Sequence, residues 1–420
     1  MQERTSNNKT PWLWIPTLYF VEGLPYFIVN TISVVMFKDM GMDNGTLALL
    51  TSLISIPWVV KPLWSPFVDL IRSKRWWILT MQFVMLAAVA LIAFSVRLTT
   101  FTVTLILFTV AAFASATHDI AADGFYMLAL NSKQQSAFVG IRNTFYRIAM
   151  VFGSGIIVVL AGVLEQKLDS IPAAWTITML VCAGLLAAFS VYHLFILPRP
   201  EEDRSNATAS GIIKGFGDAF ASFFRKPGVW LAIAFMLLYR LPEAFSVKML
   251  FPFFRDGQDI GGLGMATEAY GLVYGTFGVV ALLAGGILGG LAAARLGLRK
   301  CMWPMALSLA LPCSVYLFMS IAQPQSIWVI GSCIVLDQFG YGFGFTAYML
   351  YMIYFSQGPL KTSHYAICTA FMALSMLLPG LVAGYLQEAL GYVGFFILVM
   401  LCCIATICVT FFVRRRLPSE

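Results

Sequence analysis

Long apolar runs alternate with short polar segments along the whole chain, and this alternation is its dominant pattern. A helix needs about 20 mostly apolar residues to cross the hydrocarbon core of a bilayer. The runs that reach this length between charges, prolines or glycines lie near 12–37, 46–71, 76–96, 101–130, 137–164, 173–197, 228–254, 267–294, 300–321, 326–355, 364–388 and 391–413. The pattern therefore predicts an all-α integral membrane protein with twelve transmembrane helices.

One polar connection is longer than the others and divides the runs into six and six. It contains EEDRSNATASG followed by the amphipathic stretch IIKGFGDAFASFFRK. We predict an N-terminal six-helix bundle at 1–197, a cytoplasmic linker with an amphipathic segment at 198–227, and a C-terminal six-helix bundle at 228–420.

The composition supports a membrane protein and excludes several other classes. Of the residues, 60% are hydrophobic and 11% are charged, whereas soluble domains have about 45–50% apolar and about 25% charged residues. A soluble enzyme and a disordered protein are therefore excluded. The net charge of +7 comes from basic residues at helix ends rather than on one exposed face, so we expect no nucleic-acid partner.

The distribution of lysine and arginine predicts the orientation of the chain. Eighteen of these residues fall on the side of the two termini and four on the opposite side, Lys38, Arg97, Lys167 and Arg255. Cytoplasmic loops carry such an excess of positive charge, so we expect both termini in the cytoplasm. The polar start MQERTSNNKT leads into an apolar run too long for a signal peptide, and we expect it to stay uncleaved.

Two kinds of site are not expected. The eight cysteines lie almost entirely inside apolar runs, without the spacing of metal ligands or of a disulfide framework. The sequence has no phosphate-binding loop of the Walker type. We therefore predict neither a metal nor another cofactor, and we expect an ion gradient, most simply of protons, to supply the energy for any transport.

Ionisable side chains inside the predicted helices are the candidates for function. Each costs about 2.5–3.5 kcal/mol to insert, so such groups usually face a partner or a water-filled cavity. The candidates are Glu22, Lys61, His118, Asp119, Asp123, Arg142, Arg147, Arg240, Glu243, Lys248 and Asp337.

The fourth and fifth predicted helices are joined by a short turn, so positions at equal distance from it lie at the same depth. Asp119 is then level with Arg147, and Asp123 is level with the residue after Arg142. Asp119 and Asp123 share one face because they are four residues apart. These pairs are either structural salt bridges or cavity groups that exchange partners and couple protonation to conformation.

Lys61 and His118 each have two interpretations. Lys61 lies between Trp58 and Trp64 on one helix face, where it would hold a substrate carboxylate beside stacking surfaces for sugar rings. Alternatively, Lys61 extends toward the interface or pairs with a carboxylate of another helix. His118 is either a proton relay or a hydrogen-bonded residue of the helix interior.

Several motifs carry a resemblance to a known superfamily. GLAAARLGLRK (290–300) resembles the Gly-x-x-x-Asp-Arg-x-Gly-Arg-Arg loop of the major facilitator superfamily, with Ala294 in place of the aspartate. WSPFVDLIRSKR (64–75) keeps Asp69 and the basic cluster. PWVVKPLWSPFVD, ASATHDIAADGFYM, NTFYRIAMVFGSG, LLYRLPEAF, LDQFGYGFGFTAYM and SHYAICTAFMAL resemble the muropeptide permeases of the AmpG type, which often have Gln at the position of His118 and a small residue at that of Glu22.

The resemblance implies a central cavity with Glu22 on one side and Arg240 and Glu243 on the other. Leu24-Pro25 and Leu241-Pro242 interrupt the two helices concerned, which either marks a substrate site or reflects kinks made for packing. Asp337 and Gln338 would face the same cavity. The resemblance also implies a cytoplasmic charge latch, which would use Asp69 and Arg72.

Together these observations predict a secondary transporter in the inner (cytoplasmic) membrane, working as a monomer in the lipid bilayer by alternating access. The resemblance implies proton-coupled import of a cell-wall-derived anhydro-muropeptide or a related amino-sugar saccharide. Two alternatives stay open. One is a carrier of acetyl-CoA or another anionic solute, and the other is a membrane sensor or assembly partner that no longer transports.

Overall fold

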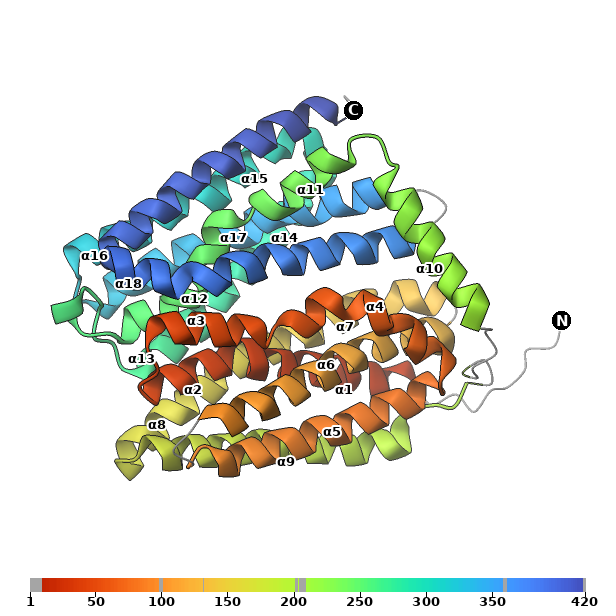
Figure 1. The fold of residues 1–420 in the computed structure, drawn as a ribbon, viewed down its shortest axis with the longest axis horizontal. Helices are drawn as coiled ribbons and strands as arrows, with labels where there is room; N and C mark the ends of the chain where they lie inside the picture. Colours follow the sequence, from red (N-terminus) through yellow and green to blue (C-terminus); the bar gives the residue numbers. More distant parts are fainter. Residues whose placement is uncertain are drawn as a thin grey trace. The chain divides into compact units, whose positions relative to one another are not determined.

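A computed structural model describes residues 10–97, 101–130, 132–200, 203, 209–357 and 361–417. These residues form helices and connections, with no strand among them (Figure 1). Eleven helical segments are long and apolar enough to cross a membrane. The last, His364–Arg416, consists of two helices that meet at Gly391, whose φ of 67° and ψ of 173° are not helical. The described segments therefore supply the twelve predicted crossings.

The described chain divides into two compact units. The first comprises Met1–Ser33 with Val60–Lys214, and the second comprises Val34–Val59 with Gly215–Glu420. The second unit thus includes the last turns of the first predicted membrane helix and the beginning of the second. The predicted boundaries at 197 and 228 stay a prediction.

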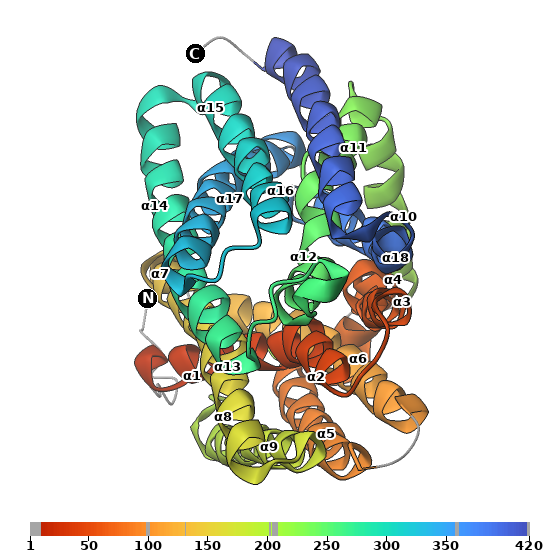
Figure 2. The same cartoon turned by 90° about the vertical axis from the view of Figure 1, so that its left-hand side faces the viewer.

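Long helices run through the first unit. They are α1 (Pro11–Phe27), α4 (Ile56–Leu70, of which all but the first turn belongs here), α5 (Lys74–Ser95), α6 (Phe101–Ala129), α7 (Ser132–Val151), α8 (Val158–Leu168) and α9 (Ile171–Ile196). Helix α5 packs between α6 and α9, as Figure 1 and Figure 2 show, and α1 packs on α7. Their shared interior is apolar and includes Trp14, Tyr19 and Phe125. This packing leaves the polar faces of α1, α4, α6 and α7 to form the site described below.

The second unit contains more and shorter helices. They are α2 (Ser33–Asp39, from Val34 on), α3 (Asn44–Leu53), α10 (Ala209–Phe224, from Gly215 on), α11 (Val229–Leu238), α12 (Leu241–Arg255), α13 (Thr267–Tyr270), α14 (Val279–Leu296), α15 (Leu298–Ala310), α16 (Ser314–Ala322), α17 (Ile327–Ser356) and α18 (Lys361–Arg416). The predicted amphipathic segment is thus a helix, α10, and Phe223 near its end is fully buried in the core of the unit.

Glycines bring α14 and α17 into backbone contact. A Cβ atom on Gly342 would lie 2.0 Å from the carbonyl oxygen of Leu282, and one on Gly285 would lie 2.1 Å from that of Phe339. Any larger residue at either position would separate the helices. The close packing of α14 on α17 therefore depends on glycine at these two positions.

The two Leu-Pro sequences have different effects on their helices. Before Pro242 the helix is interrupted, since α11 ends at Leu238 and α12 begins at Leu241. Helix α1 instead continues through Pro25 and passes into a π-helical segment, Ile28–Ile32. A π-turn contains one extra residue and leaves backbone groups less regularly bonded, and it is frequent at functional sites. The first helix is therefore not interrupted at Pro25. It is widened over Ile28–Ile32, which begins three residues later.

Candidate functional site

Five charged side chains gather in the first unit. Glu22 comes from α1, Lys61 from α4, Asp119 and Asp123 from α6, and Arg142 from α7. Lys61 forms an ion pair with Asp119. Arg142 Nη2 lies 2.8 Å from Asp123 Oδ1. We call these five residues the first-unit cluster.

Tyrosines support the Asp123–Arg142 end of the first-unit cluster. Tyr19 donates a hydrogen bond of 3.3 Å from its hydroxyl to Asp123 Oδ1. The guanidinium of Arg142 lies 4.6 Å from the centre of the Tyr19 ring and 5.4 Å from that of Tyr126. A cation over an aromatic face is stabilised by the negative charge density of the ring. The predicted pairing of Asp123 with Arg142 is therefore confirmed, with two aromatic contacts that the sequence did not indicate.

Glu22 completes the first-unit cluster and is its most buried acid. Only 7% of its surface is exposed, and its Oε2 atom is buried without a hydrogen-bond partner among the described residues. Its carboxyl group interacts electrostatically with those of Asp119 and Asp123. The first-unit cluster therefore holds three carboxyl groups and only two cations. One acid therefore lacks a compensating cation within the first-unit cluster.

The expected pairing of Asp119 with Arg147 is wrong. Asp119 pairs with Lys61, and the side chain of Arg147 is exposed. Arg142 and Arg147 are five residues apart, which turns their side chains about 140° from each other around the helix. Since Arg142 faces α6, Arg147 faces away from it. Of the two interpretations of Lys61, the structure supports the pairing with a carboxylate of another helix.

His118 points away from the first-unit cluster into the interior of the unit. It is 1% exposed, and its Nε2 lies 3.0 Å from Gln82 Nε2. The other atom of that amide, Oε1, lies 3.1 Å from His193 Nδ1, and His193 Nε2 lies 2.9 Å from Thr17 Oγ1. This geometry matches the hydrogen-bonded interpretation of His118. Sequence reasoning missed Gln82 and His193, although an amide inside an otherwise apolar run is a signal that could have been used for Gln82.

Arg240 and Glu243 form a closed pair in the second unit. Arg240 Nε lies 2.7 Å from Glu243 Oε2, and Nη2 lies 2.9 Å from Oε1. The same Nη2 donates to the Tyr341 hydroxyl at 2.8 Å, and the guanidinium lies 4.7 Å from the centre of the Phe345 ring. Arg240 is 6% exposed. A guanidinium that binds one carboxylate through two parallel bonds is held in a fixed orientation.

Asp337 and Gln338 lie side by side on α17. Asp337 Oδ2 accepts a hydrogen bond of 2.6 Å from the Tyr316 hydroxyl and one of 3.0 Å from Gln338 Nε2. Both side chains are buried. Asp337 thus has polar neighbours and no cation within ion-pair distance in the described part of the chain. Their predicted place at the substrate cavity stays a prediction.

A second group of ion pairs lies at the ends of α2 and α12, and sequence reasoning missed it. Lys38 Nζ lies 2.7 Å from Asp256 Oδ1, and Arg255 Nε lies 3.1 Å from Asp39 Oδ1. Each of two sequence dipeptides, Lys38-Asp39 and Arg255-Asp256, thus supplies the cation for one ion pair and the acid for the other. Asn44 Nδ2 donates to Asp256 Oδ2 at 3.2 Å. The signal available in the sequence was the repeated basic-acidic dipeptide at the ends of the first and seventh predicted helices.

The predicted cytoplasmic latch is only partly within the described structure. The side chain of Asp69 lies outside the described residues, so the pairing with Arg72 stays a prediction. Arg72 is exposed, with its guanidinium 6.0 Å from the centre of the Trp76 ring. Nearby, Asp203 accepts hydrogen bonds from the backbone N–H groups of Lys74 at 2.5 Å and Arg75 at 3.0 Å. The beginning of the predicted linker therefore caps α5.

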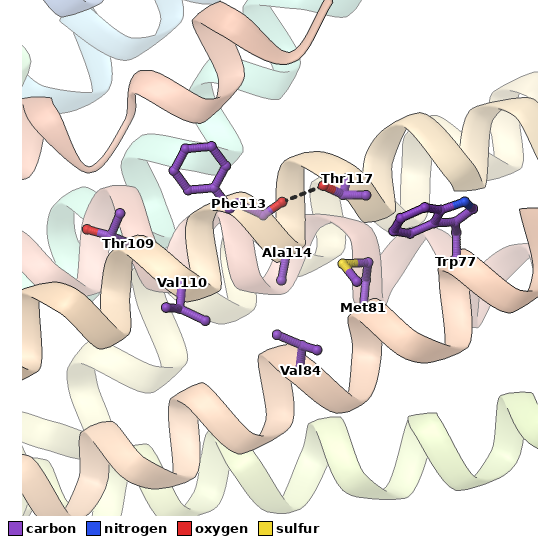
Figure 3. A pocket seen from close by; sticks show the side chains of 8 residues that line it. All are labelled: Trp77, Met81, Val84, Thr109, Val110, Phe113, Ala114 and Thr117. Carbon is purple, nitrogen blue, oxygen red and sulfur yellow. Dashed lines mark hydrogen bonds between the residues drawn. The ribbon is translucent and has the colours of Figure 1, made fainter. Parts of the chain in front are cut away.

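A shallow apolar groove of about 320 Å³ lies along α5 and α6, and Figure 3 shows its lining. The lining residues are Trp77, Met81, Val84, Thr109, Val110, Phe113, Ala114 and Thr117. The hydroxyl of Thr117 donates a hydrogen bond of 2.7 Å to the carbonyl oxygen of Phe113. With no charged group in this lining, we assign the groove no role in binding a polar solute.

Comparison with known proteins gives three findings. The profile described as Major Facilitator Superfamily matches residues 17–360, more than half of the chain. An anhydromuropeptide permease of Escherichia coli strain K12 is 24% identical over 385 residues, which cover 90% of this chain and 75% of that protein. Solved structures of transporters share the fold at lower identity.

Two of these structures illustrate the likeness. The nucleoside transporter NupG has a TM-score of 0.72 at 16% identity, covering 96% of this chain and 98% of that one. A POT family transporter in complex with a thioalcohol conjugated peptide has a TM-score of 0.74 at 12% identity, covering 96% and 95%. At these identities the similarity concerns the fold alone.

Proposed function

Because the chain belongs to the Major Facilitator Superfamily, we propose that it imports an anhydro-muropeptide or a related amino-sugar saccharide, driven by protons, through alternating access. The chain is a multi-pass membrane transporter and not an enzyme. The cargo, the coupling ion and the orientation of the termini belong to the proposal.

The acid surplus of the first-unit cluster carries the proposal of proton coupling. Its three carboxyl groups adjoin two cations, and Glu22 has a buried oxygen without a partner among the described residues. A proton on Glu22 neutralises the surplus and gives that side chain a hydrogen-bond donor. Loss of the proton leaves a buried carboxylate that must find a cation. Lys61 and Arg142 are the cations within the first-unit cluster, so a change of protonation would redistribute the ion pairs.

The reciprocal ion pairs of Lys38, Asp39, Arg255 and Asp256 support alternating access. They join the first predicted helix to the seventh, on the side where the distribution of basic residues places the cell exterior. In the proposed cycle these pairs break when the transporter opens to that side. They reform when it opens to the cytoplasm.

The name of the Escherichia coli relative supports the proposed cargo. Sugar-peptides of this kind carry both carboxyl and amide groups. The cargo enters a cell of the Gram-negative type across its inner membrane in this proposal.

The proposal is tested by uptake of labelled anhydro-muropeptide into proteoliposomes, with and without an inward proton gradient. We expect accumulation only with the gradient. Uptake that ignores the gradient would contradict proton coupling. No uptake of the muropeptide would contradict the cargo, and competition by coenzyme A esters would then favour the anionic-solute carrier. If no candidate solute accumulates and another protein co-purifies, the non-transporting alternative is favoured.

A further inference from the structure

We propose that Lys248 and Ser52 form an anion-binding subsite in the second unit, which takes a carboxylate group of the cargo. This inference rests on the proposed function and adds to it a residue pair and a chemical class. Lys248 lies on α12 and Ser52 on α3.

Lys248 has no acidic partner among the described residues. Its Nζ lies 3.5 Å from Thr51 Oγ1, the one hydrogen-bond contact it makes there. Three acids of the second unit are bound by other cations: Glu243 by Arg240, Asp39 by Arg255 and Asp256 by Lys38. Asp337 is bound to Tyr316 and Gln338. Lys248 is therefore the uncompensated cation of α12.

Lys248 is also too deep to place its ammonium group in the aqueous interface. It lies seven residues before Arg255, at the end of α12, which is a rise of about 10 Å at 1.5 Å per residue. That distance exceeds the reach of a lysine side chain directed along the helix. Ionisable groups within the membrane that lack partners usually face water or a ligand. Lys248 is partly exposed, so a ligand can approach it.

Ser52 supplies the second, independent observation. The residue is fully buried, and its hydroxyl has no hydrogen-bond partner in the described structure. A Cβ atom built on Gly380 would lie 2.3 Å from Ser52 Oγ and 3.5 Å from Lys248 Cγ, so the two side chains flank the same glycine. A buried hydroxyl without a partner is costly unless something binds it. Ser52 and Lys248 both have hydrogens available to donate.

Thr51 explains how the ammonium group is held. Its hydroxyl donates to the carbonyl oxygen of Leu47 at 2.7 Å, so only its oxygen lone pair is available for Lys248. Thr51 therefore orients the ammonium group and leaves two of its N–H bonds free. One cation and one hydroxyl match a singly charged carboxylate, which accepts hydrogen bonds at both oxygens. The absence of a side chain at Gly380 lets Ser52 Oγ lie close to that glycine, since a Cβ atom there would come within 2.3 Å of it.

The test compares two forms of one probe, an anhydro-muropeptide with free peptide carboxyl groups and the same molecule with those groups amidated. Equilibrium binding is measured on the purified full-length protein. We expect the wild-type protein to prefer the free acid by about tenfold, the worth of one charge-assisted hydrogen bond. Lys248→Met should bind both forms equally, Lys248→Arg should keep the preference, and Ser52→Ala should reduce it. Lys167→Met, which removes an exposed lysine, is the matched control and should behave as wild type.

The outcomes separate the subsite from the function on which it rests. Equal binding of both forms by the wild type, or an unchanged preference in Lys248→Met, contradicts the subsite and leaves the proposed cargo standing. Binding of neither form contradicts the cargo and the subsite together. Thermal unfolding shows whether Lys248→Met is folded. If it is not, Ser52→Ala decides, since an unchanged preference in that variant overturns the proposal.

Discussion

The first-unit cluster and helix α12 both place charged groups inside the membrane, but their charge balances are opposite. The first-unit cluster has three acids for two cations. Helix α12 begins at the closed pair of Arg240, the residue before it, and Glu243, and farther along it carries Lys248 without an acid among the described residues. A balanced pair is held by its own geometry, whereas a surplus charge requires a proton or a ligand. Arg240 and Glu243 are therefore structural charges, whereas Glu22 and Lys248 are the candidates for binding a proton or a ligand.

The two intramembrane lysines make the same point at the level of single residues. Lys61 contacts Asp119, so its charge is neutralised inside the protein. Lys248 contacts a hydroxyl. The residue type is the same in the two cases, and the neighbours differ. The neighbours therefore decide whether a buried lysine is a structural group or a candidate binding group.

The largest effect on transport is expected when the number of acids in the first-unit cluster is made equal to the number of cations. Glu22→Gln removes the surplus acid and with it the proposed proton carrier. With one proton per cargo, each unit of pH difference supports about tenfold accumulation, and we expect the variant to equilibrate its cargo without accumulating it. Uptake into proteoliposomes with an imposed pH gradient and a clamped membrane potential measures this ratio.

Exchange of labelled for unlabelled cargo should persist in Glu22→Gln, because exchange requires no net proton movement. Asp169→Asn is the control, since it removes an exposed acid outside the first-unit cluster. If Glu22→Gln accumulates cargo at the wild-type ratio, Glu22 does not take part in proton coupling.

A smaller effect is expected from opening the closed pair. Glu243→Gln leaves the buried Arg240 guanidinium without its carboxylate, and we expect the free energy of unfolding to fall by roughly 3 kcal/mol. The double variant Arg240→Met with Glu243→Gln should recover most of this loss, because no uncompensated charge remains. Unfolding in detergent measures both. A single variant as stable as the wild type would show that this pair is not structural.

The smallest expected effect comes from Asp43, an acid outside both regions that serves as a baseline. Asp43 caps α3 by accepting a hydrogen bond of 2.8 Å from the backbone N–H of Thr46. Burial alone would raise the pKa of Asp43, but the hydrogen bonds from Thr46 outweigh it and hold the pKa below its usual value. The capping stabilisation is therefore present above the unfolded pKa of about 3.9. It is lost as the pH falls through the folded pKa.

Asp43→Ala should lower the free energy of unfolding by about 1 kcal/mol at neutral pH. At pH 3, below the unfolded pKa of about 3.9, the difference from the wild type should be smaller, because the capping stabilisation is progressively lost as the pH falls from the unfolded pKa toward the folded pKa. Asp43→Asn keeps a capping side chain without a charge and should show no such pH dependence. A difference that is the same at both pH values would mean that ionisation of Asp43 does not matter for the cap.

The membrane helices could be predicted from the sequence, because each one corresponds to a continuous run of apolar residues. The third was expected at 76–96 and is found at Lys74–Ser95, and the eighth was expected at 267–294 and is found at Thr267–Ala293. The pairing of Asp123 with Arg142 was also predictable, since the two helices are joined by a short turn that fixes their relative depth.

Contacts between helices distant in sequence could not be predicted in this way. Depth gives the height of a side chain and not its direction around the helix, which is why Arg147 was wrongly paired with Asp119. The Lys61–Asp119 pair depends on which helix packs beside α6, and nothing local in the sequence states this. The same limit applies to Ser52 and Lys248, whose common neighbour Gly380 is more than a hundred residues from either.

The junction at Gly391 has a consequence for how the chain is made and handled. Its positive φ turns one helix directly into the next, with no polar loop between them. Two apolar helices joined in this way are expected to enter the bilayer as a hairpin during synthesis rather than one after the other. A protease or a labelling reagent on that side of the membrane would find no extended segment there to attack. Tyr392, the next residue, donates a hydrogen bond of 2.5 Å to Asp256 and ties this turn to the end of α12.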